Sequence, residues 1–202
     1  MPKPRRSQEA RSRATRAALI SAARRLFAER GYAGVSADEI VTDAGVTRGA
    51  LYHHFVDKRD LFRAMFEEVE RGLTEEIGLA IESAADPASG MAVGRARFLD
   101  ICERPDVVRL ALTDAPAVLG WAEWRGIEAR HGLGLIRATL ERAAAVGLIT
   151  PAPVEVLAHL VLSAMIEAAL LIAHASDRRA ARAAAEQGLL TLMSGMLIRP
   201  TS

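Results

Sequence analysis

The chain has 202 residues, half of them apolar and only 4% aromatic, and its 26 basic and 25 acidic side chains leave a net charge of +1. A single cysteine excludes an intramolecular disulfide and favours a reducing, cytoplasmic location. Alanine is abundant and no segment alternates apolar and polar residues over a useful length, so we expect an all-α protein of about nine helices.

The charge is distributed unevenly along the chain. Residues 1–16 carry six basic side chains and one acidic side chain, whereas residues 61–202 carry 14 basic and 18 acidic ones. We therefore expect residues 1–12 to form a disordered basic arm that contacts a polyanion. The candidate contacts are Arg5, Arg6, Arg11 and Arg13. A tail that only improves solubility explains the same composition.

Helical periodicity follows this arm. A helix is predicted from about Ser12 to Arg30, and Gly31 ends it. Its apolar residues fall on one face: Leu19, Ile20, Ala23, Leu26 and Phe27.

Three helix-start signals come next, at Ser36, Thr47 and Asp57. Ser36 and Glu39 form a capping box, and Gly45 marks a tight turn before Thr47. The pattern predicts a helix, a turn and a second short helix, which is the helix-turn-helix arrangement.

The short helix predicted after Thr47 has an unusual outward side. Leu51 and Phe55 are four residues apart and point inward together. The residues left outside are small, basic or aromatic: Arg48, Gly49, Ala50, Tyr52 and His53. Small residues let a helix enter a major groove, and the polar ones can donate to phosphates or base edges. An ordinary surface helix explains the same pattern.

Residues 15–62 resemble the N-terminal DNA-binding domain of TetR/AcrR-type transcriptional regulators. The resemblance rests on the run LFAERGY, on Ser36-x-x-x-Ile40, on Ala44-Gly45-Val46-Thr47, on Leu51-Tyr52-x-x-Phe55, and on Lys58 with Leu61-Phe62. It implies a three-helix DNA-binding domain over residues 13–60 and a larger helical domain for ligand binding and dimerisation over residues 61–202.

The resemblance also implies a homodimer whose two recognition helices enter successive major grooves of a pseudo-palindromic operator. The positions that would contact backbone phosphates are Ser36 and Lys58. The positions that would face DNA are Thr47, Arg48, Gly49, Ala50, Tyr52 and His53. Threonine is more frequent in the family at the position of Ala50, so a lost hydroxyl contact is expected to alter operator preference.

The remainder of the chain reads as further helices. They are predicted at about 58–83, 88–103, 106–113, 121–146, 153–175 and 177–197, with a turn or kink over DAPAVLG at 114–120. Segment 153–175 is the most membrane-like, but Glu155, His159, Glu167 and His174 interrupt it. We expect a buried helix there and no membrane partner.

A ligand cavity is expected between these later helices, and the resemblance implies a small, mainly apolar effector. Trp121, Trp124, Glu128 and His131 recur at spacings of three and four and predict one amphipathic wall. The other candidate lining residues are Phe98, Cys102, Leu110, Ile127 and Met165. Core packing or local surface contacts explain each of them as well.

The resemblance assigns the last two helices of each subunit to a four-helix bundle with the partner. The final helix carries a stripe of mostly small residues that allows close approach: Ala184, Gly188, Leu192 and Met196. An intrachain core explains the same stripe.

No catalytic motif is recognisable, and we expect neither a cofactor nor a metal site. The five histidines are scattered, and His53 and His54 diverge by about 100° on a helix. We expect a sequence-specific DNA-binding regulator, a repressor released by a small ligand. The alternative is a helical small-molecule-binding or interaction protein without a transcriptional role.

Overall fold

The computed structural model describes residues 5–198 and confirms the all-α prediction. Within these residues nine continuous helical stretches follow one another, and Ile149 and Leu197 form an isolated antiparallel bridge. The elements are α1 (Arg5–Arg30), α2 (Ala37–Asp43), α3 (Arg48–His54), α4 (Lys58–Glu82), α5 (Pro87–Cys102), α6 (Pro105–Val107), η1 (Val108–Asp114), α7 (Ala115–Leu119), α8 (Trp121–Ala145), α9 (Val154–His174) and α10 (Arg178–Ser194).

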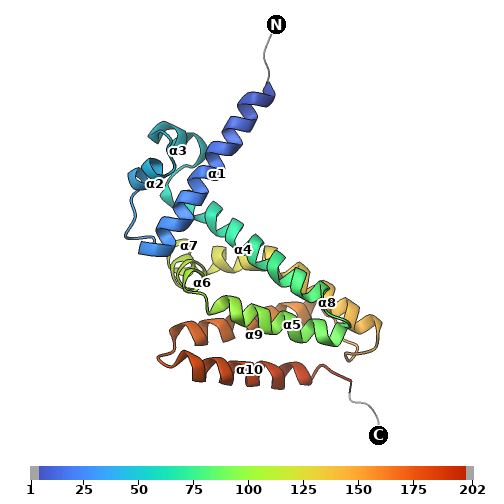
Figure 1. Ribbon diagram of the computed structural model, residues 1–202. Coiled ribbons are helices and arrows are strands. Elements are labelled where there is room, and N and C mark those ends of the chain that lie inside the picture. The colour runs from blue at the N-terminus through green and yellow to red at the C-terminus, as the bar shows by residue number, and fades with distance from the viewer. Residues whose placement is uncertain (1–4, 199–202) are drawn as a thin grey trace.

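The first helix begins earlier than the sequence pattern predicts. α1 includes residues 5–12, so the expectation of a disordered arm is wrong for these residues, and residues 1–4 lie outside the described part of the chain. Residues 5–12 contain no glycine or proline, and arginine, glutamine, glutamate and alanine predominate, all of which favour helix. With this extension, α1 projects well beyond α2 and α3 (Figure 1).

Side-chain caps fix the corners between α1 and α4, which confirms the predicted helix starts. The Ser36 hydroxyl accepts a hydrogen bond from the backbone amide of Glu39 at 3.2 Å, and the Glu39 carboxylate accepts one from the backbone amide of Ser36 at 2.8 Å. Thr47 and Asp57 cap α3 and α4 in the same manner. Gly45, in the turn between α2 and α3, has a φ of +65°, which residues with a Cβ rarely adopt.

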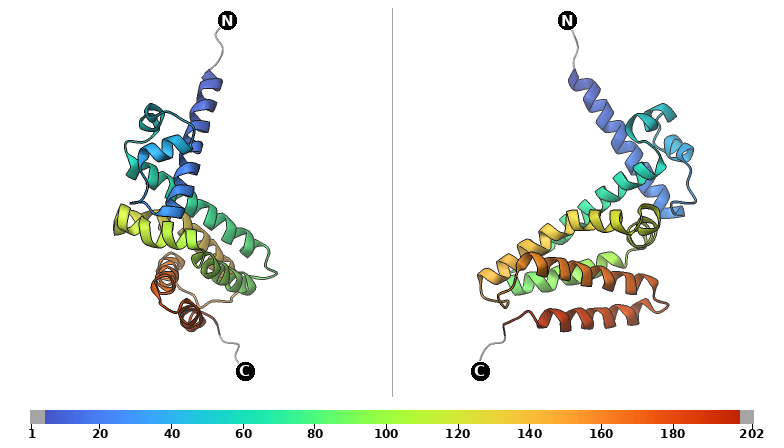
Figure 2. Two further views of the ribbon diagram at one scale, coloured as in Figure 1. Left: turned by 60° about the vertical axis from the view of Figure 1, so that its left-hand side comes forward. Right: turned by 180° about the vertical axis from the view of Figure 1, so that it is seen from behind.

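One apolar core extends from the N-terminal helices into the larger helical body. It includes Phe27, Leu51 and Phe62 at one end and Trp124 and Ile166 at the other. α4 joins the two ends, because it packs against α1 as well as against α5 and α8 (Figures 1 and 2). The two parts of the molecule are therefore coupled by shared packing.

Of the turn or kink predicted at residues 114–120, the turn is wrong, because residues 114–119 are helical. The helix continues through η1 and α7 and ends only at Gly120, where φ is +81°. Pro116 lies at the start of α7, directly after η1. At the end of η1, the Asp114 carboxylate accepts the amide of Tyr32 at 2.8 Å, which ties this segment to the turn after α1. η1 itself has the wider turns of a π-helix.

α9 and α10 lie side by side at the end of the molecule opposite α3 (Figure 2). Among the described helices, α9 alone is long and apolar enough to cross a membrane by composition. Its inner side packs against α5 and α8, and 44% of its most apolar 18-residue window is buried within the chain. It is thus a core helix on one side and an uncovered apolar surface on the other.

Candidate nucleic-acid interface and effector cavity

α3 lies on the surface with one side anchored in the core. Two buried side chains, Leu51 and Phe55, anchor it. The outer side consists of the residues expected to face DNA, of which all but the half-buried Ala50 are exposed: Thr47, Arg48, Gly49, Tyr52 and His53. The hydroxyl of Thr47 accepts the amide of Ala50 at 3.2 Å and so fixes the first turn.

Gly49 leaves open space on this outer side. A Cβ at this position would meet only one atom within 4 Å, the Thr47 hydroxyl oxygen at 3.9 Å, and the φ of Gly49 is not positive. Neither packing within the chain nor the backbone conformation therefore requires glycine here. Glycine also weakens a helix by about 1 kcal/mol relative to alanine. Close approach of an external surface explains the residue better than any intrachain contact.

Arg48 is oriented by its neighbours and remains accessible. Its guanidinium lies 3.2 Å from the carboxylate of Asp38 on α2 and 5.8 Å from the centre of the Tyr52 ring. The side chains of Arg48 and Asp38 are 64% and 65% exposed, so their ion pair contributes little to stability. A phosphate or a guanine edge can compete for this guanidinium.

The two expected phosphate contacts beside α3 are already engaged within the chain. The Ser36 hydroxyl donates to the Glu39 carboxylate at 2.7 Å. The Lys58 ammonium donates to the carbonyl oxygens of Tyr32 and Val35 at 3.0 and 2.9 Å and lies 4.0 Å from the Tyr32 ring centre. Burial among these groups lowers the pKa of Lys58. Lys58 therefore holds the α1–α2 connection, a role the sequence did not reveal, with one N–H left for a phosphate.

Arginines continue the polar surface along α1. Arg11 and Arg13 are exposed, whereas Arg5 and Arg6 belong to the helical backbone and their side chains lie outside what the structure describes. Sequence reasoning missed Arg16, whose guanidinium lies 5.4 Å from the Phe55 ring centre, beside the end of α3. Its spacing of three residues from Arg13 was the available signal.

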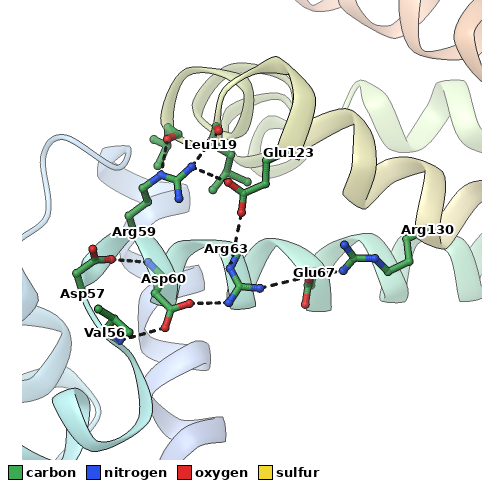
Figure 3. A network of polar contacts seen from close by, with 10 residues as sticks. Val56, Asp57, Arg59, Asp60, Arg63, Glu67, Leu119, Glu123 and Arg130 are labelled. Carbon is green, nitrogen blue, oxygen red and sulfur yellow. Dashed lines mark hydrogen bonds and ion pairs between the residues drawn. The ribbon is translucent and has the colours of Figure 1, made fainter.

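A polar network joins the end of α3 to α8 (Figure 3). Asp60 accepts the amide of Val56 at 3.1 Å and the guanidinium of Arg63 at 2.6 Å. Arg63 lies 3.7 Å from Glu123 on α8, and Arg59 donates to the same carboxylate at 2.6 Å. Arg59 also donates to two carbonyl groups at the end of α7, at 3.1 and 2.9 Å. These contacts connect α8 to the segment that follows α3.

The larger helical body encloses a mainly apolar cavity lined chiefly by α4, α5, η1, α8 and α9, with one residue each from α6 and α10. It holds about 1070 Å³ of atom-free space, counting the part that is open to solvent. Most lining residues are aliphatic, and the polar exceptions are Glu70, Thr74, Arg95, Cys102, Glu128 and Thr139. No group of three potential metal ligands occurs among the described residues.

The structure brings only part of the predicted lining to this cavity. Phe98, Cys102, Glu128 and Met165 lie in its wall, whereas Leu110, Trp121, Trp124, Ile127 and His131 do not. The predicted stripe selected the correct side of α8, but the cavity extends from Glu128 to Leu140. The two tryptophans precede it by one to two turns, so Trp124 is fully buried in the core and Trp121 is 61% exposed.

Sequence reasoning missed Glu70, and the signal was present. Phe66, Glu70, Leu73 and Ile77 follow one apolar stripe of α4, and the carboxyl interrupts it. Burial raises the pKa of Glu70 to about 7. Burial, reinforced by the nearby Glu70, raises the pKa of Glu128 to about 8. The cavity therefore holds two carboxyl groups that are poorly solvated.

The outward sides of α9 and α10 form an apolar surface. Val156, Leu160 and Leu171 of α9 and Leu192 of α10 are each more than half exposed. In the predicted dimer stripe, Ala184 and Gly188 are also exposed and Met196 is half-buried. Most of this stripe is not intrachain core, which leaves it free to contact another molecule.

Comparison with known proteins relates both parts of the chain to described families. Residues 19–65 match the family described as bacterial regulatory proteins, tetR family, and residues 88–196 match the tetracyclin repressor-like C-terminal domain. A TetR-family transcriptional regulator from Pectobacterium atrosepticum, known from its crystal structure, is 33% identical. The alignment covers 98% of this chain and 100% of that chain, with a TM-score of 0.87.

Two relatives have functional names. The transcriptional repressor AcnR of Corynebacterium efficiens is 29% identical over 76% of this chain and 78% of its own length. The transcriptional regulator AcrR of Shigella flexneri is 42% identical, but over only 37% of this chain and 35% of its own length.

Proposed function

Because the chain belongs to the TetR family of bacterial transcriptional regulators, we propose that it is a cytoplasmic, homodimeric repressor released from a pseudo-palindromic operator by a small, mainly apolar effector. The chain is a DNA-binding transcriptional regulator, and its family consists of regulators rather than enzymes. The observation that carries the proposal is made on the outer side of α3. Gly49 leaves open space there, although no contact within the described residues requires a glycine at this position.

α3 would read base pairs in the major groove while neighbouring arginines hold the phosphates. The guanidinium of Arg48 and its partner, the carboxylate of Asp38, are both exposed. Replacing this ion pair by a contact with DNA therefore costs little free energy. Tyr52 and His53 extend the same side and can contact phosphate, sugar or base edges. Arg11, Arg13 and Arg16 on α1 lie on the same unit and supply positive charge beside the groove.

Two copies are needed because one seven-residue helix reads only a few base pairs. The exposed apolar residues of α9 and α10 support a dimer built on these helices. Contact between two copies would bury Leu160 and Leu192, and Gly188 would allow the helices to approach closely, because a Cβ there meets no atom within 4 Å.

Release would follow from a shift between two arrangements of the subunits. An effector that fits the cavity better when the recognition helices are misplaced would favour that arrangement. Two connections support such coupling. Val107, Ala111 and Leu112 line the cavity from the segment whose Asp114 holds Tyr32. On the other side, α8 lines the cavity and carries Glu123 of the polar network.

The experiment begins with selection of a duplex from random DNA by the purified chain. Fluorescence anisotropy then compares wild type with Arg48→Ala and Tyr52→Ala. We expect each variant to lose roughly tenfold or more in affinity, the order of one lost specific contact. Arg142→Ala is the matched control, since Arg142 is exposed on α8 far from α3. Unchanged affinity in both α3 variants would favour the alternative, a helical ligand-binding protein without a transcriptional role.

A further inference from the structure

One part of the cavity holds two acidic side chains that its apolar lining does not explain. Glu70 projects from α4 and Glu128 from α8 into the same space. The two helices pack against each other, and Cys102 lines the same cavity. The charge of Glu70 helps to raise the pKa of Glu128, and both carboxylates help to raise the pKa of Cys102. Within residues 5–198, Glu128 has an ion pair with Arg125 at 3.2 Å, whereas no protein group lowers the pKa of Glu70.

We propose that the ligand of this cavity is an amphiphile with one cationic nitrogen and an elongated apolar body, and that the nitrogen binds between Glu70 and Glu128. The inference rests on the proposed function, because it names the chemical class of molecule to which the regulator responds.

The other charges near these carboxyl groups do not neutralise both of them. Arg125 is matched by Glu128. Arg95 also lines the cavity, but its charge does not lower the pKa of Glu70 or of Glu128. Near Cys102, Arg182 is paired with Asp100 at 2.8 Å, and Glu103 adds a further negative charge. The space around Glu70 is therefore short of one positive charge.

Arg95 distinguishes the two ends of the cavity. Its Nε is buried without a hydrogen-bond partner, so it can donate to an acceptor on the far part of a ligand. The remaining wall between Arg95 and Glu70 is mainly aliphatic and aromatic, with Leu73, Ile77 and Phe98 among its residues. This arrangement suits an extended molecule that is cationic at one end and apolar along its length.

The energetics favour a cation over a neutral or anionic ligand. An unpaired carboxylate in an apolar wall is costly, so in the empty cavity Glu70 tends to hold a proton, and its pKa is about 7. A cation removes this cost and stabilises the ionised form, whereas an anion adds repulsion. Binding of a cation is therefore expected to release protons to the solvent.

The test compares three probes that share a ten-carbon chain and differ in charge: decylammonium, decanol and decanoate. Calorimetric titration of the 202-residue chain at pH 7, below the micelle concentrations, gives each affinity. We expect decylammonium to bind roughly tenfold or more tightly than decanol, the order of one charge-assisted hydrogen bond. Decanoate should also bind less tightly than decylammonium, because Glu70 repels its carboxylate, although Arg95 at the other end of the cavity can attract it. Titration in buffers of different ionisation enthalpy should show proton release with decylammonium alone.

Two variants on one helix make the test specific. Glu70→Gln keeps the shape of the side chain and removes its charge, and Glu75→Gln is the control, because Glu75 is exposed and pairs only with Arg71. We expect Glu70→Gln to lose the preference for decylammonium and to retain binding of decanol, which also shows that it folds. Tighter binding of decanol or decanoate by wild type would overturn the inference, as would an unchanged preference in Glu70→Gln.

Operator binding in the same samples separates this inference from the proposed function. Selective binding of decylammonium without any change in DNA affinity would uphold the ligand class and contradict effector-controlled release. Release of DNA by decanoate, with no binding of decylammonium, would uphold the regulator and overturn the cationic ligand.

Discussion

The outer side of α3 and the cavity of the larger helical body are built by opposite means. Five of the six residues on the outer side of α3 are exposed, and all six come from the single run Thr47–His53 with its capping threonine. The cavity takes its wall from α4, α5, η1, α8, α9 and α10, and its lining is mainly buried. A substitution on the exposed side of α3 changes what the protein contacts. A substitution in the cavity wall also changes the packing of the core. Substitutions in the two regions should therefore separate DNA affinity from stability.

The largest expected effect is on stability, at Trp124. This side chain is fully buried in the core that joins α1 to α9, so Trp124→Ala is expected to cost about 3–5 kcal/mol of unfolding free energy. Thermal and urea denaturation at one fixed protein concentration would measure it. Trp121→Ala is the control, because Trp121 is 61% exposed one turn earlier, and we expect a loss of about 1 kcal/mol or less.

The same experiment tests whether the two regions are one cooperative unit. Because the core is continuous, α1–α3 should unfold in the same transition as the larger helical body in both proteins. Two separate transitions in the Trp124→Ala variant would show that the DNA-binding unit is stable without the helices that surround the cavity.

The next effect is on DNA affinity, at Gly49. A leucine at this position meets no intrachain obstacle but fills the outer side of α3, so Gly49→Leu should lower operator affinity roughly 10–100-fold and leave thermal stability unchanged or slightly higher. Anisotropy with the selected duplex measures the affinity. Gly134→Leu is the control, since Gly134 is an exposed glycine on α8 with equally open surroundings. Equal DNA binding by the two variants would remove α3 from the interface.

A smaller effect is expected on the communication between the regions. Glu123→Gln weakens the ion pairs with Arg59 and Arg63 and leaves both the outer side of α3 and the cavity wall intact. We expect operator affinity without ligand to stay within about threefold of wild type, whereas the fold-change caused by a bound ligand falls several-fold. Glu141→Gln, an exposed change later on α8, is the control. An unaltered response in the Glu123 variant would show that coupling runs through η1 instead.

The contrast between the regions also explains what the sequence predicts well. The helix starts at Ser36, Thr47 and Asp57 depend on residues three positions apart, and the structure confirms each cap. The inward residues Leu51 and Phe55 follow from a spacing of four, and both are buried. Local patterns suffice here because the unit is made from short, consecutive elements.

The cavity shows where such patterns fail. Periodicity identifies which side of α8 faces inward. It does not identify the position along α8 at which the neighbouring helices move apart to leave a cavity, so the predicted wall begins at Trp121 instead of Glu128. The same limit applies to Lys58, whose partners Tyr32 and Val35 lie more than 20 residues earlier in the chain. Glu70 is a single polar residue on an apolar stripe of α4, and an ordinary core helix shows the same pattern, so the sequence alone does not single it out.

The smallest expected effect is on the pH dependence of stability, and its sign differs between the regions. The folded-state pKa of Glu70 is raised from 4.5 to about 7, so its contribution is fully present below pH 4.5 and is lost as the pH rises through about 7. Glu39, whose hydrogen bonds with Ser36 lower its pKa to about 2, contributes stability above pH 4.5 and loses it as the pH falls through about 2. Of these two carboxyl groups, only Glu70 changes its contribution to stability between pH 5.5 and 8.5.

Melting temperatures measured over that interval test this difference. We expect Glu70→Gln to lose less stability than wild type as the pH rises from 5.5 to 8.5. Each kcal/mol of difference in unfolding free energy should shift the melting temperature by roughly 2–4 °C. Glu39→Gln should follow the wild-type slope over the same interval, although its stability is lower throughout. His54 and His131, whose pKa values burial lowers, titrate in both proteins and cancel in the difference between the curves. Glu128, with a pKa of about 8 that Glu70 helps to raise, does not cancel, so the difference reports Glu70 together with its effect on Glu128. Parallel curves for wild type and Glu70→Gln would mean that Glu70 is well solvated, and the cavity would then lack the unpaired charge that attracts a cation.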